Sequence, residues 1–234
     1  MNQAYSMPGA LPVSQVGVET RATFITKTYA HLLGAIVAFV GLEVFLFTSG
    51  LAEPIASAMV SVPWLAILGA FMVVSWIASR AAGQAKSMGV QYAALAAFVA
   101  AYTLLFVPLL YAATVVAPGA IQTAALITLT AFAGLTWVAF STRKDFSFLG
   151  GLLRWGMILA LVAIVGGAIF GFQLGVFFSV GMVGLAGAAI LYDTSNVLHH
   201  YPEGRYVAAS LQLFASVALM LWYVLQLVMS FSSD

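Results

Sequence analysis

The chain has 234 residues, of which 63% are hydrophobic and only 6% are charged, and its formal net charge is +1. A soluble domain carries about 25% charged residues, so this composition excludes a water-exposed globular surface. The chain has no cysteine, which excludes disulfides, thiolate metal sites, cysteine nucleophiles and lipidated cysteines.

The first 28 residues are polar and contain scattered Gly and Pro. No apolar region with a small-residue cleavage site comes before the first long apolar run, so we expect no signal peptide. We interpret residues 1–28 as a flexible cytoplasmic tail and residues 29–234 as the transmembrane domain.

Seven apolar runs follow, each long enough to cross a bilayer. A spanning helix needs roughly 20 predominantly apolar residues, and it satisfies its own backbone polar groups inside the hydrocarbon. The seven runs are Tyr29–Phe47, Val62–Ala78, Tyr92–Ala113, Ile121–Phe140, Leu152–Phe170, Val176–Tyr192 and Val207–Met229. The sequence therefore predicts an all-α integral membrane protein, a bundle of seven transmembrane helices whose first partner is the lipid bilayer.

The basic residues predict the orientation of this bundle. Lys and Arg in short loops mark the cytoplasmic side of a membrane. With seven spans, every basic residue falls on one side: Arg21, Lys27, Arg80, Lys86, Arg143, Lys144, Arg154 and Arg205. We therefore expect the N-terminus in the cytoplasm and the C-terminus outside.

Polar side chains follow one face of the seventh predicted helix. At about 100° per residue, Gln212, Ser216, Tyr223, Gln226 and Ser230 share that face. Polar groups avoid lipid, so we expect this face to point into the bundle. It would either hydrogen-bond to other helices or line a pore.

Small residues in the fifth and sixth predicted helices suggest close helix packing. Gly171, Gly175, Gly181, Gly184 and Ala188 have the small side chains that let membrane helices approach one another. We expect these positions to serve packing rather than chemistry.

Glu43 is one of two acids that we single out. It lies about 21 Å along the first predicted helix, in the outer part of a hydrocarbon layer of about 30 Å. An unpaired carboxylate at that depth is expected to carry a proton. Glu43 is either a proton or cation ligand, or it reaches the outer headgroups.

Asp193 is the second acid, in the segment AILYDTSNVLHHYPEGRY at the predicted end of the sixth helix. If the helix continues for one or two turns, Asp193, Asn196 and His200 share a face through i, i+3 and i+7 spacing. A carboxylate, an amide and an imidazole together would form a pH-sensitive gate.

Two other interpretations of Asp193 remain open. The segment could be the polar end of a helix, with Asp193 paired to Arg80 or Arg205 across the cytoplasmic surface. A metal site of Asp193, His199 and His200 is disfavoured, because adjacent histidines project in different directions on a helix.

The sequence gives little support for catalysis. Intramembrane aspartyl proteases need two aspartates that share a proton, and the seventh helix has no acid. The chain also lacks GxGD and HExxH strings, and no GxSxG serine has a histidine at membrane depth. We predict no enzyme, no catalytic residue, no cofactor and no nucleic-acid partner.

Four strings resemble the Bax inhibitor-1 family, also called the transmembrane Bax inhibitor motif family, and its bacterial YccA-like members in particular. They are TKTYAHLL, STRKDFSFLGGLL, ILYDTSNV and FSSD. The resemblance runs from about Thr26 to Asp234. It implies a seven-helix bundle with the seventh helix at the centre, in a bacterial inner membrane.

Members of the family are described as pH-sensitive calcium leak channels and, in eukaryotes, as suppressors of stress-induced cell death. The YccA-like members are linked to modulation of a membrane-bound AAA+ quality-control protease.

The resemblance also assigns residues. In channel-like members the YD aspartate pairs with an aspartate of the seventh helix and is governed by a base at the end of the second helix. Asp193 matches the first aspartate, and Arg80 is the nearest match to the base. The second aspartate falls at Phe214 or Ser216, and neither residue is acidic. A pair of carboxylates sharing a proton is therefore not expected.

A substitute network could join Asp193 to Arg80, His200 or Gln212. Two hypotheses follow. The first is a cation leak in which calcium is the transported ion, Asp193 is a weak calcium site, and the pathway residues are Asp193, Arg80, His200, Asn196, Glu43 and Gln212. The second is a non-conducting modulator of the AAA+ protease that acts through the tail and cytoplasmic loops.

Overall fold

The computed structural model describes residues 11–232, and these residues form eight α-helices. Seven of the helices are long and apolar enough to cross a membrane, which confirms the seven predicted spans. Their bounds are α1 Val18–Thr48, α3 Trp64–Gln84, α4 Met88–Val116, α5 Ala120–Thr142, α6 Leu149–Phe170, α7 Gly175–His199 and α8 Tyr206–Ser232. The remaining helix, α2 (Ala52–Val60), is too short to span and lies between the first two spans, α1 and α3.

Helix α1 begins earlier than predicted, at Val18 rather than Tyr29. Two side chains of this early part, Phe24 and Thr28, are buried, and the Phe24 ring lies 6.4 Å from the ring of Tyr201. The polar composition of residues 18–28 concealed this packing face. The first ten residues of the predicted tail lie outside the described residues.

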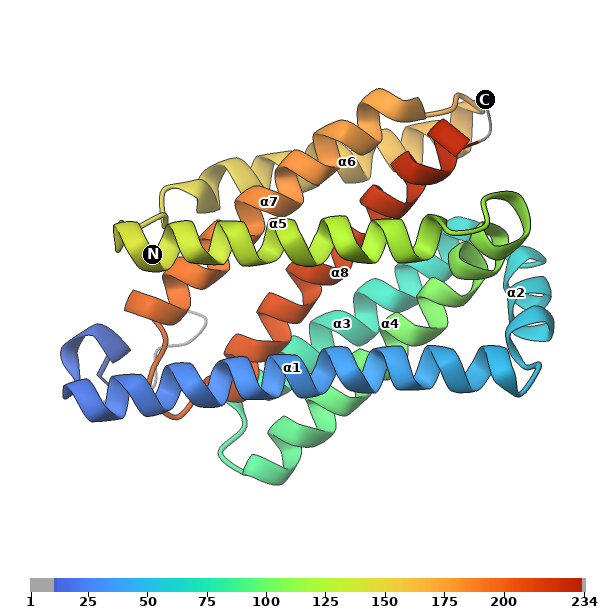
Figure 1. Cartoon of the computed structure of the whole chain (residues 1–234). Coiled ribbons are helices and arrows are strands. Elements are labelled where there is room, and N and C mark those ends of the chain that lie inside the picture. Colours follow the sequence, from blue (N-terminus) through green and yellow to red (C-terminus); the bar gives the residue numbers. More distant parts are fainter. Residues whose placement is uncertain (1–10, 233–234) are drawn as a thin grey trace.

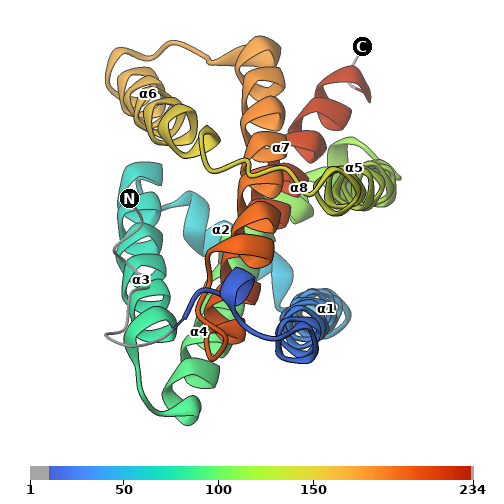
Figure 2. The same ribbon diagram turned by 90° about the vertical axis from the view of Figure 1, so that its left-hand side faces the viewer.

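Helix α8 packs against α1, α3, α4, α5 and α7, whereas α6 packs on α7 and α2 packs on α4. Figure 1 shows α8 crossing behind α1 and α5. Figure 2 shows α6 on the opposite side of α7 from α5. The central place expected for the last helix, inside a ring of the six others, therefore stays a prediction.

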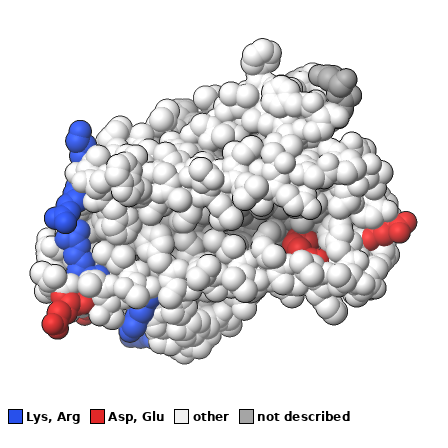
Figure 3. Space-filling view, in the orientation of Figure 1, with Lys and Arg blue, Asp and Glu red and all other residues white. Residues whose placement is uncertain are grey.

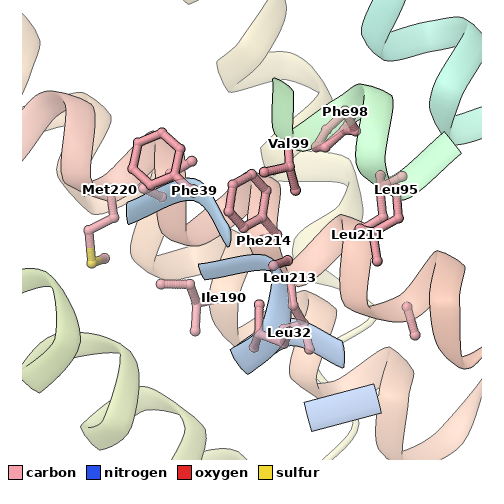
Figure 4. Close-up of a cluster of buried hydrophobic side chains, with 14 of the residues drawn as sticks. Leu32, Phe39, Leu95, Phe98, Val99, Ile190, Leu211, Leu213, Phe214 and Met220 are labelled. Atoms are coloured by element: carbon pink, nitrogen blue, oxygen red, sulfur yellow. The ribbon is translucent and has the colours of Figure 1, made fainter. Parts of the chain in front are cut away.

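Aromatic and aliphatic side chains from several helices, among them α1, α4, α7 and α8, form the core (Figure 4). The ring of Phe214 on α8 lies 6.0 Å from Phe39 on α1 and 6.3 Å from Phe98 on α4. Large apolar side chains also cover the outer surface; Phe177, for example, is 92% exposed. Such a surface suits contact with lipid.

Lys and Arg side chains gather at one end of the face shown in Figure 3, over the ends of α1 and α5. This one-sided placement of the basic residues is what a chain oriented by its basic loops would show. The assignment of that end to the cytoplasm stays a prediction.

Candidate functional site

The last two turns of α7 are polar in sequence yet buried in the structure. All residues from Asp193 to Leu198 are buried, including Asp193 at 3% and Asn196 at 4% exposed. Polar groups at such a position need partners from neighbouring elements. Three elements supply them: α8, the loop of residues 143–148, and the segment before α1.

Asp193 is bonded to α8. The hydroxyl of Ser216 donates a hydrogen bond of 2.5 Å to Oδ2 of Asp193. This contact identifies Ser216, rather than Phe214, as the residue that faces Asp193. Phe214 instead lies in the aromatic core, with its ring 5.4 Å from that of Tyr102. A hydroxyl therefore stands opposite the carboxyl where channel-like members of the resembled family have a second acid.

The face predicted for Asp193, Asn196 and His200 is only partly formed. Helix α7 continues to His199, as that interpretation required, and Asp193 and Asn196 are both buried. His200, however, caps the helix with φ −117°, so the chain leaves the helical path there. Its ring turns outward and pairs with Asp145 instead.

Asp145, in the string RKDFSFL, is the residue that our sequence reasoning missed. Its Oδ2 lies 2.9 Å from His200 Nε2, and its Oδ1 accepts bonds from the Ser147 N–H at 2.9 Å and the Ser195 hydroxyl at 3.3 Å. The Ser195 hydroxyl in turn accepts the Phe146 N–H at 2.9 Å. The Asp-x-Ser spacing was a sign of such a turn, because Asp often accepts the N–H two residues on.

This network fastens the loop between α5 and α6 to the end of α7. Burial opposes ionisation of Asp145, but the N–H and hydroxyl of Ser147, together with His200, hold the pKa of Asp145 below its ordinary value. The ionised carboxylate is thus the form that closes the loop.

The other proposed partners of Asp193 lie elsewhere. Arg80 is exposed, and its guanidinium lies 5.3 Å from the ring centre of Trp76 on the same helix. Gln212 is half-buried. Within residues 11–232, neither these two side chains nor His200 is bonded to Asp193. Buried Arg205 donates a bond of 2.6 Å to the carbonyl oxygen of Ala85, at the turn between α3 and α4.

The first turn of α1 and the segment before it cover the end of α7. Arg21 Nη2 donates to the Leu198 carbonyl at 3.0 Å, the Ser14 hydroxyl to the His199 carbonyl at 2.8 Å, and the Val13 N–H to the Tyr201 carbonyl at 2.8 Å. The last carbonyls of a helix lack partners within it and attract cations. We call these three contacts the N-terminal clasp.

Part of the polar face of α8, which we expected to point into the bundle, contacts α7. Besides Ser216, Gln226 accepts a bond of 3.3 Å from the Ser179 hydroxyl, and Tyr223 is buried. The Ser216 and Gln226 contacts are hydrogen bonds between helices, which is the first of the two interpretations of this face. They also place polar groups along one line between α7 and α8.

Glu43 lies inside the bundle. It is 7% exposed, and within the part of the chain described here neither carboxylate oxygen has a hydrogen-bond partner. Acids in such positions are rare in membrane helices and are often functional. An acid buried in this way does not reach the outer headgroups.

The weak calcium site expected at Asp193 stays a prediction. Calcium takes six to eight oxygen ligands, whereas the site shows one carboxylate and one hydroxyl. Residues 11–232 contain no group of three His, Cys, Asp or Glu side chains placed to hold a metal ion. A transported cation would meet a single carboxylate here.

Comparison with known proteins agrees with this architecture. The family model described as Bax1-I, inhibitor of apoptosis-promoting Bax1, matches residues 21–233. An uncharacterized protein of Pseudomonas aeruginosa is 34% identical over 110 residues, 46% of this chain and 48% of that protein. YccA of Escherichia coli, named as a modulator of FtsH protease, is 35% identical over 78 residues, 33% of this chain and 35% of YccA. Bax inhibitor 1 of Schizosaccharomyces pombe is 32% identical over 108 residues, 45% of this chain and 40% of that protein.

The matched segments thus span about half or less of these relatives' lengths. YccA of a second Escherichia coli strain is named as an inner membrane protein. With the seven apolar helices, this likeness makes the chain a multi-pass protein of the inner membrane.

Proposed function

We propose that this chain, which belongs to the Bax1-I family of inhibitors of apoptosis-promoting Bax1, is a cation leak pathway with Asp193 as its gate. One observation carries the proposal: Asp193 is 3% exposed and, within residues 11–232, its carboxyl is bonded to a single hydroxyl, that of Ser216. An ionised carboxylate in such surroundings is costly unless it has more partners. A change in its proton occupancy would therefore change the contact between α7 and α8.

The rest of the pathway would follow the polar groups between α7 and α8. From Asp193 and Ser216 the line continues to Ser179 and Gln226, and Glu43 on α1 is a second buried acid. Protons are the first candidate, because one carboxyl and hydroxyl groups can relay them. Calcium needs more oxygen ligands than this site shows, so it would cross only with water completing its shell.

Flux into proteoliposomes tests the proposal. Purified protein is reconstituted, and proton and calcium entry are followed from pH 6 to 8 for the wild type, Asp193→Asn and Asp145→Asn. Asn keeps the shape of the side chain and cannot exchange a proton. We expect a pH-dependent flux in the wild type and in Asp145→Asn, and a flux without pH dependence in Asp193→Asn. Wild-type flux no higher than in empty vesicles would reject the leak.

A second function rests on the N-terminal clasp and on one relative. YccA is named as a modulator of FtsH protease. In this chain the segment before α1 is bonded to the end of α7, so a partner that pulled on the tail would also act on the bundle. Under this alternative the chain conducts nothing and regulates a membrane-bound protease. The names of these relatives describe a modulator and an inhibitor rather than an enzyme.

Two deletions distinguish the alternatives. Removing residues 1–10 leaves the clasp residues in place, whereas removing residues 1–19 takes away Val13 and Ser14. If the chain modulates the protease through its tail, the shorter deletion abolishes modulation and leaves the clasp in place. If modulation survives both deletions, the tail is not the contact.

A further inference from the structure

A groove of about 440 Å³ runs along the outside of the bundle between α1 and α4. Its walls are apolar, and α1 contributes residues with small side chains at intervals of one helical turn: Ala30, Gly34 and Ala38. The lining residues include Ala30, Gly34, Ala38 and Leu42 on α1 and Leu95 and Val99 on α4. From Ala30 to Leu42 the groove runs about 18 Å along α1. That length is close to one leaflet of a hydrocarbon layer about 30 Å thick.

Polar and basic groups gather at the end of this groove near Ala30. His31 and Tyr92 line it there; the His31 Nε2 lies 3.0 Å from the Tyr92 hydroxyl, which lies 3.4 Å from the Tyr206 hydroxyl. The Lys27 ammonium lies 5.3 Å from the ring centre of Tyr206. Lys27 is exposed and Tyr92 is 42% exposed, so these groups are open to a ligand.

We propose that this groove binds one anionic phospholipid of the leaflet on the basic side of the bundle. One acyl chain lies between α1 and α4, over Gly34 and Ala38. The phosphate lies against the Lys27 ammonium, beside the hydroxyls of Tyr92 and Tyr206. Amphipathic rings and basic side chains at this depth are the groups that meet headgroups in membrane proteins.

Charge complementarity favours a lipid over a second copy of the chain. Small residues at one-turn intervals can also receive another helix. A helix seated here would bury the Lys27 ammonium, which would then need a new partner from that helix. A phospholipid brings that partner, its phosphate, to the same depth as the ammonium.

Gly34 provides a direct test of the groove. A Cβ atom at Gly34 would meet nothing within 4 Å, so a larger side chain would occupy the groove without displacing the protein. Gly41 is a matched control, because it lies on the same helix, outside the groove lining, and is equally open. Ala38→Leu is a second way to fill the groove.

The experiment is native mass spectrometry of the full-length protein in detergent. Phosphatidylglycerol and phosphatidylcholine with identical acyl chains are titrated separately. The variants are Gly34→Leu, Ala38→Leu, Gly41→Leu, Lys27→Gln and Lys86→Gln. Lys86→Gln removes an equal charge from an exposed position between α3 and α4, outside the groove lining.

We expect the wild type to retain one phosphatidylglycerol in preference to phosphatidylcholine. Gly34→Leu and Ala38→Leu should lose it, whereas Gly41→Leu should keep it. Lys27→Gln should weaken the binding of phosphatidylglycerol about fivefold, which is the contribution of one basic residue near an anionic membrane surface. Equal retention by Gly34→Leu and Gly41→Leu, or equal weakening by Lys27→Gln and Lys86→Gln, would overturn the proposal. A dimer that Gly34→Leu abolishes would assign the groove to a second copy.

Discussion

Ser216 on α8 donates a hydrogen bond of 2.5 Å to Asp193 on α7, and both side chains are buried. The pair joins the two helices at the end of α7 that also carries the loop network of Asp145 and the N-terminal clasp. A change at Asp193 would therefore be transmitted to α8 directly and to the loop through neighbouring Ser195. This arrangement makes Ser216 the best position at which to alter the site.

The change Ser216→Asp would place a second carboxyl opposite Asp193. Two carboxyls so close cannot both ionise without a large cost, so they would share a proton. We expect the pH dependence of flux to become steeper and calcium to bind more tightly than in the wild type. Proteoliposome flux between pH 5 and 8 and calcium titration measure both effects.

Ser230→Asp is the control for this experiment, because it adds an acid to the same helix at a half-buried position whose wild-type hydroxyl bonds only its own backbone. If both variants change flux alike, the effect comes from added charge in α8. If Ser216→Asp behaves as the wild type, Asp193 is not the gate.

Asp145→Asn should flatten the dependence of stability on pH in acid. Because the pKa of Asp145 is lowered in the folded protein, its ionised form stabilises the fold at and above the ordinary value near 4. That contribution is lost as the pH falls through the lowered pKa. The pair with His200 is about half exposed, so its loss should cost less than about 1 kcal/mol.

The melting temperature in detergent from pH 3 to 7 measures this effect. Glu203→Gln is the control, because it removes an equal charge from the neighbouring turn. Its melting temperature should fall with pH below pH 4 as steeply as that of the wild type. The assignment fails if Asp145→Asn and the wild type lose stability in parallel through that range.

Arg21→Ala should open the N-terminal clasp. It removes a charge-assisted bond to the Leu198 carbonyl, and bonds of this kind contribute about 1.5–3 kcal/mol. Hydrogen exchange at the Val13 N–H, which is bonded to the Tyr201 carbonyl, should then become at least several-fold faster. Arg154→Ala, an exposed change on the same predicted side, should leave that rate unchanged. Unchanged exchange in Arg21→Ala would mean that Val13 and Ser14 hold the segment without it.

The sequence predicted the seven spans because apolar length alone decides which segments cross a bilayer. It did not predict α2, which is too short for that signal, or the early start of α1, whose buried residues are spaced among polar ones. It named Asp193 and the inward face of α8. The pairing of Asp193 with Ser216 depends on the axial position of α7 relative to α8, and no pattern within one helix contains that information. Asp145 was missed because its partners Ser195 and His200 come from a distant part of the chain.

Glycine positions show the same limit. A Cβ atom at Gly181 or Gly184, which we expected to be close-packing positions, would meet nothing within 4 Å. At Gly156 on α6 it would come within 2.5 Å of Leu185 Cδ1 on α7. A side chain at Gly156 would therefore require Leu185 to move, and the sequence did not distinguish this glycine from the others.

Gly156→Val should consequently destabilise the packing of α6 on α7 by about 1–3 kcal/mol, as overpacking does. Leu185 is the group displaced, so Leu185→Ala should offset the effect. The double variant should lose less stability than the sum of the two single changes, because the residues share one space. Thermal unfolding of the four proteins in one detergent measures this cycle. Gly181→Val is the control, because there is room for its side chain, and it should melt close to the wild type. Additive losses for Gly156→Val and Leu185→Ala would show that α6 does not pack on α7 through this contact.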